Sequence, residues 1–513
     1  STGREALQKN IQAAMALAEA IRSTLGPKGL DKLLIDDEGR TLVTNDGVTV
    51  LETAKVEHPV AKMMINTSST QDRIAKDGTT STVILAGEML QNAWQLILQG
   101  IHPSTIARGY RKSEQYLLQC ISEIRFDSDD KMKSNVVKTS LAGKGHSSMQ
   151  ETIARVSLDA VQMVADIDST IDISKIKLVS QTGGKVEDSK VFRGLMIPKK
   201  RISSDMDKEV NRGKIILIDG GLEKSNVATD LKLNVTTVGV LESFRQEERN
   251  MLKRQVDNLV EHGVTVLACR ESIDDEIKNY LSENGIQAFR RVARSDLNML
   301  ARVCDATLVN SVDSLTSNDL GSFIVSKNTT IEGKDFWIVE GDGKAATIIA
   351  KASTVDVVGE VERCFDDSLG VSVQLVENGF VVCGGGASYV ALARRLRRYA
   401  ETIPGREQLA VEAYADAIEV IVRVLAENAG IDPITTLLDV VAKQTNTNSD
   451  YIGIDLSTGA PSDMVKLGIL EPEGIVKQAI IGATEVAISI LRIDDVLWAK
   501  QEMQMPDMPD DEM

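Results

Sequence analysis

The chain has 513 residues, of which 42% are hydrophobic, 26% charged and 4% aromatic, and its net charge is −17. One hydrophobic core stops growing at roughly 250–300 residues, so we expect two or three domains. The composition excludes a disordered chain. The negative charge opposes loose association with nucleic acid or with anionic membranes, so we expect neither as a partner.

The cysteines and the first residues indicate the compartment. Five widely spaced cysteines, with no C-x-x-C pair, argue against a disulfide scaffold or a structural zinc site. STGREALQKN at the start lacks the apolar core of a signal peptide, and we expect no run that approaches the ~18 apolar residues of a membrane span. A cytoplasmic protein is therefore expected.

The first predicted elements are mostly helical. Residues 5–24 form an amphipathic helix, and TLVTNDGVTV is predicted to be a hairpin that turns at residues 45–47, because β-branched runs flank Asn-Asp-Gly. Further helices are predicted over 80–99 and 103–124.

The predicted secondary structure changes in the middle of the chain. Between about 195 and 350, short β runs such as KIILID and VTVLAC alternate with helices, which is typical of an α/β domain. Amphipathic helices return after about 354, including 407–430 and 472–491. We infer a discontinuous helical domain with the α/β block inserted in it, followed by a disordered tail, MQMPDMPDDEM.

The strongest chemical signal is the segment KDGTTS, residues 76–81, directly before an apolar helix. Unpaired N–H groups at a helix start bind phosphate, and an acidic residue beside phosphate indicates a bridging magnesium ion. Asp77 is the candidate metal ligand. The competing interpretation is an ordinary Ser/Thr N-cap after an Asp-Gly turn.

Two other features concern phosphate binding. The turn LGPKG, residues 25–29, would place main-chain atoms close to phosphates. The alternative is that it only terminates a helix. The Walker A pattern is absent from the sequence, so a P-loop fold is unsupported.

Motifs along the whole chain resemble those of one family. STLGPKGLDKLLID, TNDGVTVL, VEHPVAKMM and KDGTTSTVILAGEML are similar to the amino-terminal region of group II chaperonins, and GGKVED, GIQAFRRVARSDL, CGGGAS, LAENAGIDP and SILRIDDV continue the similarity. The resemblance covers residues 3 to 500 and is closer to archaeal thermosomes than to single eukaryotic TRiC/CCT subunits.

The resemblance implies the multidomain α+β chaperonin fold. We expect a mainly helical equatorial ATPase domain (1–134 and 386–513), a small intermediate hinge domain (135–194 and 349–385) and an α/β apical domain (195–348). Within 224–259 the family carries a helical lid protrusion. Val227–Val240 is the better lid candidate, while the later part is predicted to be a surface helix that buries Phe244, Met251, Leu252, Val256 and Leu259.

The resemblance also assigns site residues. Asp46 and Asp367 would be catalytic, with Asp46 positioning the attacking water, and Asp77 would bind Mg²⁺. Lys144 would sense the γ-phosphate, and Glu471 would contact ribose. The remaining contacts to ATP would come from Thr24, Leu25, Gly26, Pro27, Gly47, Gly78, Thr79, Thr80, Ser81, Gly385, Gly386 and Asp455, with Gly384 completing the glycine run.

Each assignment has a plainer alternative. Asp46 would be only a turn residue, and Lys144 a solvated loop lysine. Asp367 would be an exposed helix charge paired with Arg363, and a one-residue slip would exchange it with Asp366.

The function implied is an ATP- and Mg²⁺-dependent chaperone. Its subunits, identical or paralogous, would form a double ring that encloses unfolded client proteins. Lys76 stands where the family has glycine, so the alternative is a structural subunit of a mixed ring with weak ATPase activity. An unrelated ATP-dependent metabolic enzyme is the third class, but residues 195–350 show no cluster of His, Cys or paired carboxylates.

Overall fold

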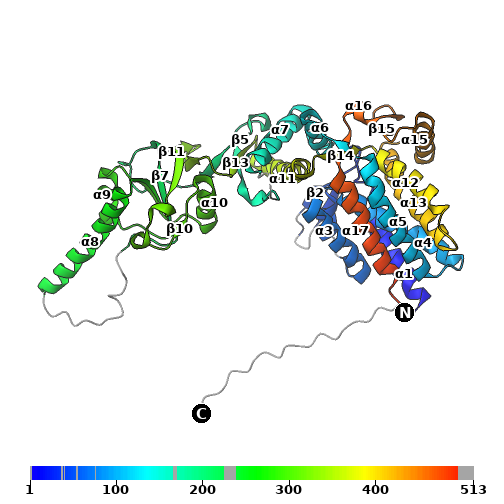
Figure 1. Ribbon diagram of the computed structural model, residues 1–513, viewed down its shortest axis with the longest axis horizontal. Coiled ribbons are helices and arrows are strands. Elements are labelled where there is room, and N and C mark those ends of the chain that lie inside the picture. Colours follow the sequence, from blue (N-terminus) through cyan, green and yellow to red (C-terminus); the bar gives the residue numbers. More distant parts are fainter. Residues whose placement is uncertain are drawn as a thin grey trace, which may run out of the picture. The chain divides into compact units, whose positions relative to one another are not determined.

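A computed structural model describes residues 3–35, 39, 41–53, 56–75, 77–165, 170–223 and 238–494 (Figure 1). The chain divides into two compact units. Unit 1 combines Ser1–Gly143 with Gly379–Met513, and unit 2 is Lys144–Asn378. Helices and strands occur in both units, so the protein is of the mixed α+β class, as the sequence predicts.

Unit 1 is mainly helical and is built from two chain segments. The first contains α1 (Arg4–Arg22), β1 (Lys32–Ile35), β2 (Thr41–Thr44), α2 (Gly47–Thr53), α3 (Pro59–Ala75), α4 (Thr79–Leu98), α5 (Pro103–Ile124), β3 (Phe126–Asp127) and α6 (Asp130–Ser140). The second contains β14 (Phe380–Cys383), α12 (Ala387–Ala400), α13 (Glu407–Ile418), α14 (Val420–Asn428), α15 (Pro433–Thr447), β15 (Ile452–Asp455), β16 (Ala460–Asp463), α16 (Met464–Leu467), β17 (Leu470–Pro472) and α17 (Glu473–Leu491).

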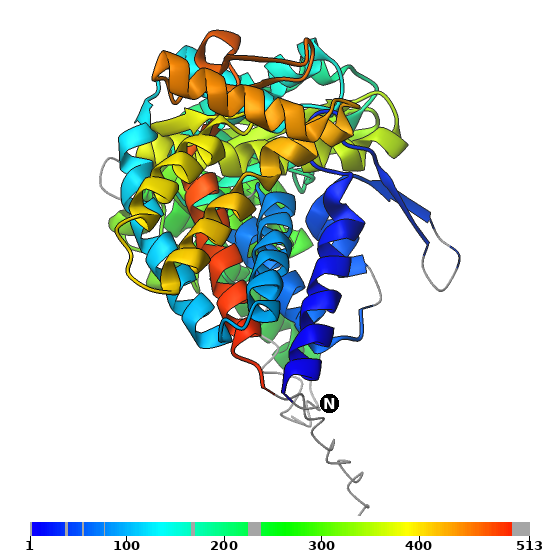
Figure 2. The same cartoon turned by 90° about the vertical axis from the view of Figure 1, so that its right-hand side faces the viewer.

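Helix α4 forms the centre of the unit 1 core and packs against both α1 and α17 (Figure 2). Its apolar residues surround the helix axis, which is the pattern of a helix buried on all sides. Helix α17 is long and apolar enough to span a membrane, contrary to the expectation that no run approaches that length. Its buried residues pack against α3, α4 and α5, and this burial accounts for its composition.

The predicted hairpin around residues 45–47 is wrong. Strand β2 ends at Thr44 and pairs with β1 before it, whereas the residues after Asp46 form helix α2. Val48 and Leu51 are buried at helical spacing, and Asp46 accepts a hydrogen bond from the Thr49 N–H at 3.0 Å. An acidic N-cap therefore outweighs the strand propensity of a short β-branched run.

Unit 2 contains one large sheet and one small one. Its elements are α7 (Ser147–Val164), β4 (Ile176–Thr182), β5 (Lys190–Phe192), β6 (Gly194–Ile197), β7 (Glu209–Ile218), α8 (Val238–Glu261), β8 (Val264–Cys269), α9 (Lys278–Glu283), β9 (Gln287–Phe289), α10 (Arg294–Cys304), β10 (Leu308–Val309), β11 (Gly321–Ile331), β12 (Lys334–Glu340), β13 (Ala346–Ala352) and α11 (Val355–Asn378). The small sheet, in the order β4-β13-β5, packs against α7 and α11.

The seven-stranded sheet has the order β6-β12-β11-β7-β8-β9, with β10 also pairing with β7. Strand β7 is parallel to β8 and β10, and its apolar run covers both faces. Ile216 and Ile218 belong to the core that contains α8 residues, whereas Ile215 and Leu217 belong to the core that contains α10 residues. The alternation of strands and helices predicted for residues 195–350 is confirmed.

Helix α8 extends beyond the face that it covers. Leu252, Val256 and Leu259 are fully buried, as predicted. Phe244 is 51% exposed and Met251 is also exposed, so the predicted stripe is wrong for these two residues. Met251 directly precedes the buried Leu252, so it lies on another side of the helix, and Phe244, seven residues before Met251, lies on that same outer side. Most of the lid candidate, residues 227–237, lies outside the described residues.

Candidate functional site

The start of α4 has free backbone donors. Gly78 occupies the N-cap position with φ 77°, and no side chain caps the helix. The alternative of a Ser/Thr N-cap is therefore wrong, because a glycine stands at that position. Thr79, Thr80 and Ser81 form the first turn, so their N–H groups and hydroxyls are available to an anion. Lys76 lies outside the described residues.

Asp77 is held in place at this helix start. Its Oδ1 accepts a hydrogen bond from the Gly78 N–H at 2.7 Å, and its carbonyl accepts one from Gln71 Nε2 at 3.0 Å. Gln71 is buried on α3. The loop conformation that presents Asp77 therefore depends on α3 as well as on α4.

Asp46 lies at the start of α2. Its Oδ2 accepts hydrogen bonds from Thr49 N (3.0 Å) and Thr49 Oγ1 (2.6 Å), and its own N–H donates to Thr44 Oγ1 at 3.1 Å. The alternative of a simple hairpin-turn residue does not hold, because Asp46 caps a helix. This cap fixes the carboxylate in one orientation.

Gly47 brings the α2 start against the α4 start. A Cβ added at Gly47 would overlap Thr80 Oγ1 and lie 3.4 Å from Thr79 Oγ1. Only glycine allows this approach without a shift of the α4 turn. The Asp46–Gly47 and Asp77–Thr80 segments are therefore neighbours, although 30 residues of chain lie between Asp46 and Asp77.

A glycine run approaches the same region from the second chain segment. Strand β14 pairs with β17, placing Val382 opposite Glu471, and then continues into Gly384, Gly385 and Gly386 before α12. Gly385 and Gly386 both have positive φ. A Cβ on Gly386 would overlap Val422, and a Cβ on Gly384 would lie 3.5 Å from Glu471 Cγ. The glycines thus permit close backbone packing beside Glu471.

Glu471 and Asp77 interact electrostatically. Burial, and after it the charge of Asp77, raises the pKa of Glu471 to about 7. Burial also raises the pKa of Tyr389, with contributions from Glu471 and Asp77. The structure therefore brings Asp77 near Glu471.

This arrangement fits Mg²⁺ bound together with a nucleotide. No group of three or more His, Cys, Asp or Glu side chains suited to a metal occurs among the described residues. Mg²⁺ usually takes one or two carboxylates together with water and substrate phosphates, so a lone Asp77 beside an anion-binding helix start is adequate. Asp77 would hold the ion.

The raised pKa of Glu471 predicts a pH-dependent stability. The folded state holds this proton more tightly than the unfolded chain does, so the group destabilises folding increasingly as pH rises from about 4.5 to about 7. Glu471→Gln should raise the melting temperature of nucleotide-free, EDTA-treated protein at pH 8 and leave it unchanged at pH 4. The free energy of unfolding at pH 8 should rise by at most about 3 kcal/mol, since one pKa unit corresponds to about 1.4 kcal/mol. Equal effects at both pH values would contradict the assignment.

The loop after α1 approaches α14. Gly26 has φ 79°, and a Cβ there would overlap Leu425, while Asn428 Nδ2 donates to the Leu25 carbonyl at 2.9 Å. Leu425 lies three residues after Val422, which faces Gly386. Thr24 Oγ1 donates to Ile21 O at 2.7 Å, and Pro27 completes the turn. The loop of residues 24–27 and the glycine run thus pack on successive turns of α14.

Asp455 has a local role in the structure. Its Oδ1 accepts hydrogen bonds from Ser457 N (3.0 Å) and Ser457 Oγ (2.6 Å), which lower its pKa and fix the turn between β15 and β16. Its neighbour Ile454 donates a backbone hydrogen bond to Gly385 O at 3.0 Å. Asp455 therefore belongs to the strand that supports the glycine run.

Lys144 and Asp367 meet in unit 2. Lys144 Nζ lies 2.7 Å from Asp367 Oδ2, and their side chains are 20% and 30% exposed. Arg363 pairs with Glu360 at 2.8 Å. Asp366 is exposed, so Asp367 is the aspartate of this pair that faces Lys144. The lysine is not simply solvated.

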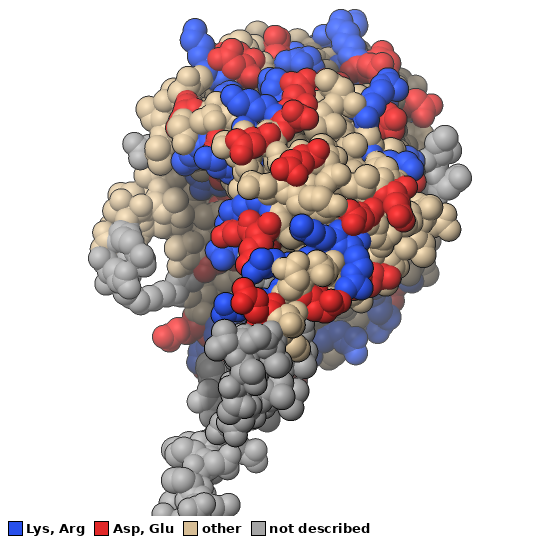
Figure 3. Space-filling view, turned by 90° about the vertical axis from the view of Figure 1, so that its left-hand side faces the viewer, with Lys and Arg blue, Asp and Glu red and all other residues tan. Residues whose placement is uncertain are grey.

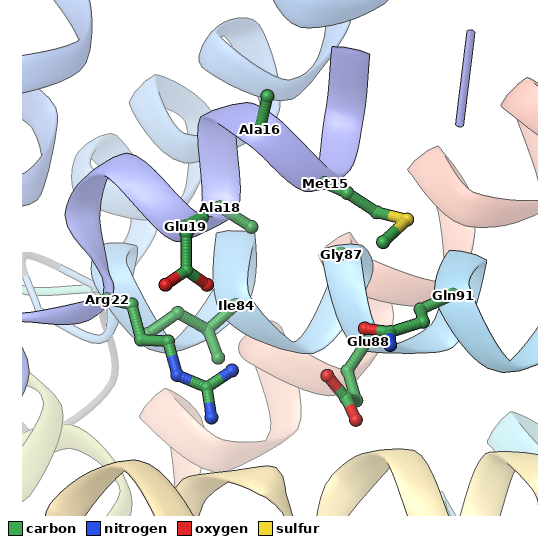
Figure 4. A pocket seen from close by; sticks show the side chains of 9 residues that line it. All are labelled: Met15, Ala16, Ala18, Glu19, Arg22, Ile84, Gly87, Glu88 and Gln91. Atoms are coloured by element: carbon green, nitrogen blue, oxygen red, sulfur yellow. The ribbon is translucent and has the colours of Figure 1, made fainter. Parts of the chain in front are cut away.

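Two pockets lie elsewhere. One, of about 270 Å³, lies between α1 and α4 and is lined by Met15, Ala16, Ala18, Glu19, Arg22, Ile84, Gly87, Glu88 and Gln91 (Figure 4). Another, of about 470 Å³, is lined by Lys175, Arg302, Val303, Cys304, Asp305, Ser322, Asp342, Gly343 and Lys344. Neither contains a residue predicted for the nucleotide site.

Sequence reasoning missed the residues that support the site. Gln71 holds the Asp77 carbonyl, Thr49 fixes Asp46, and Asn428 binds the Leu25 carbonyl. Only Thr49 carries a local signal, as an Asp followed three residues later by Thr at a helix start. The other two act across the fold and have no pattern in the sequence.

The site combines the start of α4, which has no side-chain cap, with the neighbouring carboxylates of Asp46 and Asp77 and with the glycine run 384–386. These features define a nucleotide-binding protein of mixed α+β class. The model of the TCP-1/cpn60 chaperonin family matches residues 17–501, so the chain belongs to this family. The ATP-dependent protein-folding activity predicted from the motifs is the activity of this family.

The chain is similar to subunits of archaeal chaperonins. It is 42% identical to a thermosome subunit of Methanopyrus kandleri over 508 residues, which is 97% of this chain and 93% of the relative. It is 41% identical to a thermosome subunit of Pyrococcus horikoshii (97% and 92%) and 41% identical to thermosome subunit beta of Thermoplasma acidophilum (97% and 93%). The predicted thermosome-like group II chaperonin family is thereby confirmed.

Proposed function

We propose that the chain is a thermosome-type subunit that binds MgATP in unit 1 and uses its hydrolysis to enclose and fold client proteins. The observation that carries this proposal is the side-by-side arrangement of Asp46–Gly47 and Asp77–Thr80 at an uncapped helix start. A carboxylate fixed beside a phosphate-binding helix start is what hydrolysis of a terminal phosphate requires.

Each site residue has a part in this reaction. The N–H groups and hydroxyls of Thr79, Thr80 and Ser81, together with residues 25–27, surround the phosphates, and Gly385 and Gly386 let the backbone approach the adenosine moiety. Asp77 holds Mg²⁺, which neutralises phosphate charge when bound. The Asp46 carboxylate orients the attacking water and accepts its proton, while Glu471 contacts the ribose and Asp367 completes the catalytic set.

The two compact units support a division of labour. Unit 1, assembled from both ends of the chain and ending at Gly143 and Gly379, would contain the equatorial domain (1–134 and 386–513) and the ends of the intermediate domain. In unit 2, the small sheet with α7 and α11 would form the rest of the intermediate domain (135–194 and 349–385), and the seven-stranded sheet the apical domain (195–348). The exposed first half of α8 would lead into the lid.

Clients would meet a mixed surface on unit 2. Figure 3 views the side on which α8 and α9 lie in Figure 1, and there basic, acidic and uncharged side chains are interspersed. Interspersed charges produce no strong field of one sign that would select a highly charged ligand. ATP binding would shift the subunit toward a closed state through its greater affinity for that state.

Strands β1 and β2 offer a surface for another subunit. One face of this hairpin packs on the core through Leu34, while Leu33, Ile35 and Val43 on the other face are 60%, 67% and 57% exposed. Among the described strands, β1 and β2 pair only with each other, so both outer edges are open. Exposed apolar groups beside open strand edges favour pairing with a second copy of the chain.

Leu33→Asp should therefore prevent ring assembly and leave the subunit folded. The introduced charge would have to be buried in the contact, and burying an unpaired charge is costly. Size-exclusion chromatography with light scattering should show smaller species with native circular dichroism. Leu438→Asp on α15 is the matched control, since it makes the same change at a leucine that is 62% exposed on another element. Intact rings from Leu33→Asp would contradict this assembly surface.

The proposed function is tested by refolding. A chemically denatured enzyme should regain activity when mixed with the purified protein, Mg²⁺ and ATP, and not when ADP replaces ATP. Negative-stain images should show stacked rings with a central cavity. If the enzyme regains its activity to the same extent without nucleotide, the chain is a passive binding protein and the proposed ATP-driven folding is wrong.

A further inference from the structure

Helix α10 belongs to the seven-stranded sheet of unit 2. Its residues Leu297, Leu300 and Val303 are buried in the core that the helix forms with strand residues of that sheet. Two short connections join the small sheet β4-β13-β5 to this larger sheet: residue 193 between β5 and β6, and residues 341–345 between β12 and β13. Two such connections allow the sheets to pivot against each other unless further contacts hold them.

The first turn of α10 is attached to the small sheet by an ion pair. Lys177 on β4 places its Nζ 2.6 Å from Asp296 Oδ1, and the two side chains are 25% and 16% exposed. Partly buried charges are screened much less by water and salt than exposed ones. Removing either partner would leave the other charge without its counterion at a site with little water, so the attachment requires both side chains.

The last turn of α10 is attached to the same side. Arg302 Nη1 donates to Ser174 Oγ at 3.2 Å, in the turn directly before β4. The Val303 carbonyl accepts from the Gly343 N–H at 2.9 Å, in the connection between β12 and β13. Asp296 and Arg302 are about 9 Å apart along the helix axis, at 1.5 Å per residue. Attachments at both ends of one helix resist a pivot about either of them.

We propose that α10 couples the two sheets of unit 2. The Lys177–Asp296 pair and the attachments at Arg302 and Val303 keep the seven-stranded sheet fixed to the small sheet throughout the ATPase cycle. The small sheet packs against α11, which carries Asp367, so a nucleotide-driven movement of the small sheet is passed on to the sheet proposed to meet clients. Lys177 and Asp296 are positioning residues outside the nucleotide site. The inference rests on the proposed function.

Variants of the ion pair should uncouple ATP hydrolysis from client folding. In the assembled protein, Lys177→Met and Asp296→Asn should each lower the yield of refolded client enzyme per ATP hydrolysed about 5-fold, the size of effect expected when a coupling contact is lost. The kcat for ATP should stay at the wild-type value. The charge-swapped variant K177D/D296K should recover most of the yield, because it restores an ion pair. Lys327→Met is the matched control, since Lys327 pairs with Glu209 at 3.3 Å within the large sheet itself.

A reversible cross-link tests the attachment directly. The variant Lys177→Cys/Asp296→Cys would be joined by a bifunctional reagent that forms a disulfide with each thiol and is as long as the two replaced side chains. The five native cysteines are buried and therefore protected from the reagent. If α10 stays attached throughout the cycle, the linked protein should refold its client with the wild-type yield, whether or not Lys177→Met assembles.

Two results would overturn the inference. One is a loss of refolding in the linked protein that a reductant reverses, because the pair must then open during the cycle. The other is a wild-type yield per ATP from Lys177→Met. A protein that hydrolyses ATP but refolds no client even in its unaltered form would contradict the proposed function instead.

Discussion

Asp46→Asn is expected to lower kcat for ATP hydrolysis about 10²- to 10⁴-fold, the range for loss of a general base. The change removes the negative charge that orients and deprotonates water. It keeps the helix cap, because asparagine caps helices as well as aspartate does and can still accept from Thr49. ATP affinity and ring assembly should therefore remain at wild-type levels. Phosphate release, isothermal titration and size-exclusion chromatography measure the three quantities.

A matched control exists on α15. Asp432 caps that helix by accepting from Ile434 N at 3.4 Å and Thr435 N at 3.3 Å, as Asp46 caps α2. Asp432→Asn makes the same chemical change at the same local position and should leave kcat unchanged. If Asp46→Asn hydrolyses ATP normally, Asp46 is only a helix cap and the proposed reaction site is wrong.

Asp77→Asn should raise the Mg²⁺ concentration for half-maximal ATPase activity by at least about 10-fold, the effect expected when a metal site loses ligand charge. Turnover at saturating Mg²⁺ should fall as well, because phosphate charge is then poorly neutralised. Mg²⁺ titrations at fixed ATP measure both effects. Asp130→Asn, an exposed aspartate at the start of α6, is the control.

The Asp77 variant has a second readout. Asp77 raises the pKa of Glu471, so Asp77→Asn should bring this pKa closer to its ordinary value. The stabilisation by Glu471→Gln at pH 8 should accordingly be smaller in the Asp77→Asn background. An unchanged Mg²⁺ requirement together with additive melting temperatures would show that Asp77 neither binds the ion nor faces Glu471.

Helices with clear boundaries could be predicted from the sequence. The helix expected over residues 5–24 is α1 (Arg4–Arg22), because its apolar positions recur at helical spacing and a Gly-Pro turn follows. The helix expected at 103–124 has the bounds of α5, whose first residue is a proline. Local sequence signals suffice where residues that are close in the chain determine the structure.

The errors arose where the residue pattern allows more than one structure. The residues after Asp46 favour a strand by propensity, but the Asp46 carboxylate caps a helix that begins at Gly47, and the segment becomes α2. Phe244 and Met251 are apolar, yet they share a side of α8 that lies away from the buried face formed by Leu252, Val256 and Leu259. Not every apolar residue of a surface helix lies on the face that its partner covers.

The site divides in the same way. Asp77 and residues 78–81 could be found from the chain alone, because phosphate binding at a helix start is a local property. Glu471 and Gly385 could be named only through the family resemblance, since the pairing of β14 with β17 joins segments about 90 residues apart. The partnership of Lys144 with Asp367 spans 223 residues and required the structure.

An experimental structure of the assembled protein with Mg²⁺ and a non-hydrolysable ATP analogue tests the central claim most directly. We expect the ion on Asp77, the terminal phosphates at the N–H groups of Thr79–Ser81, and the Asp46 carboxylate beside the γ-phosphate. Nucleotide density in the α1/α4 pocket of Figure 4, or in the pocket around Arg302 and Lys344, would contradict the account.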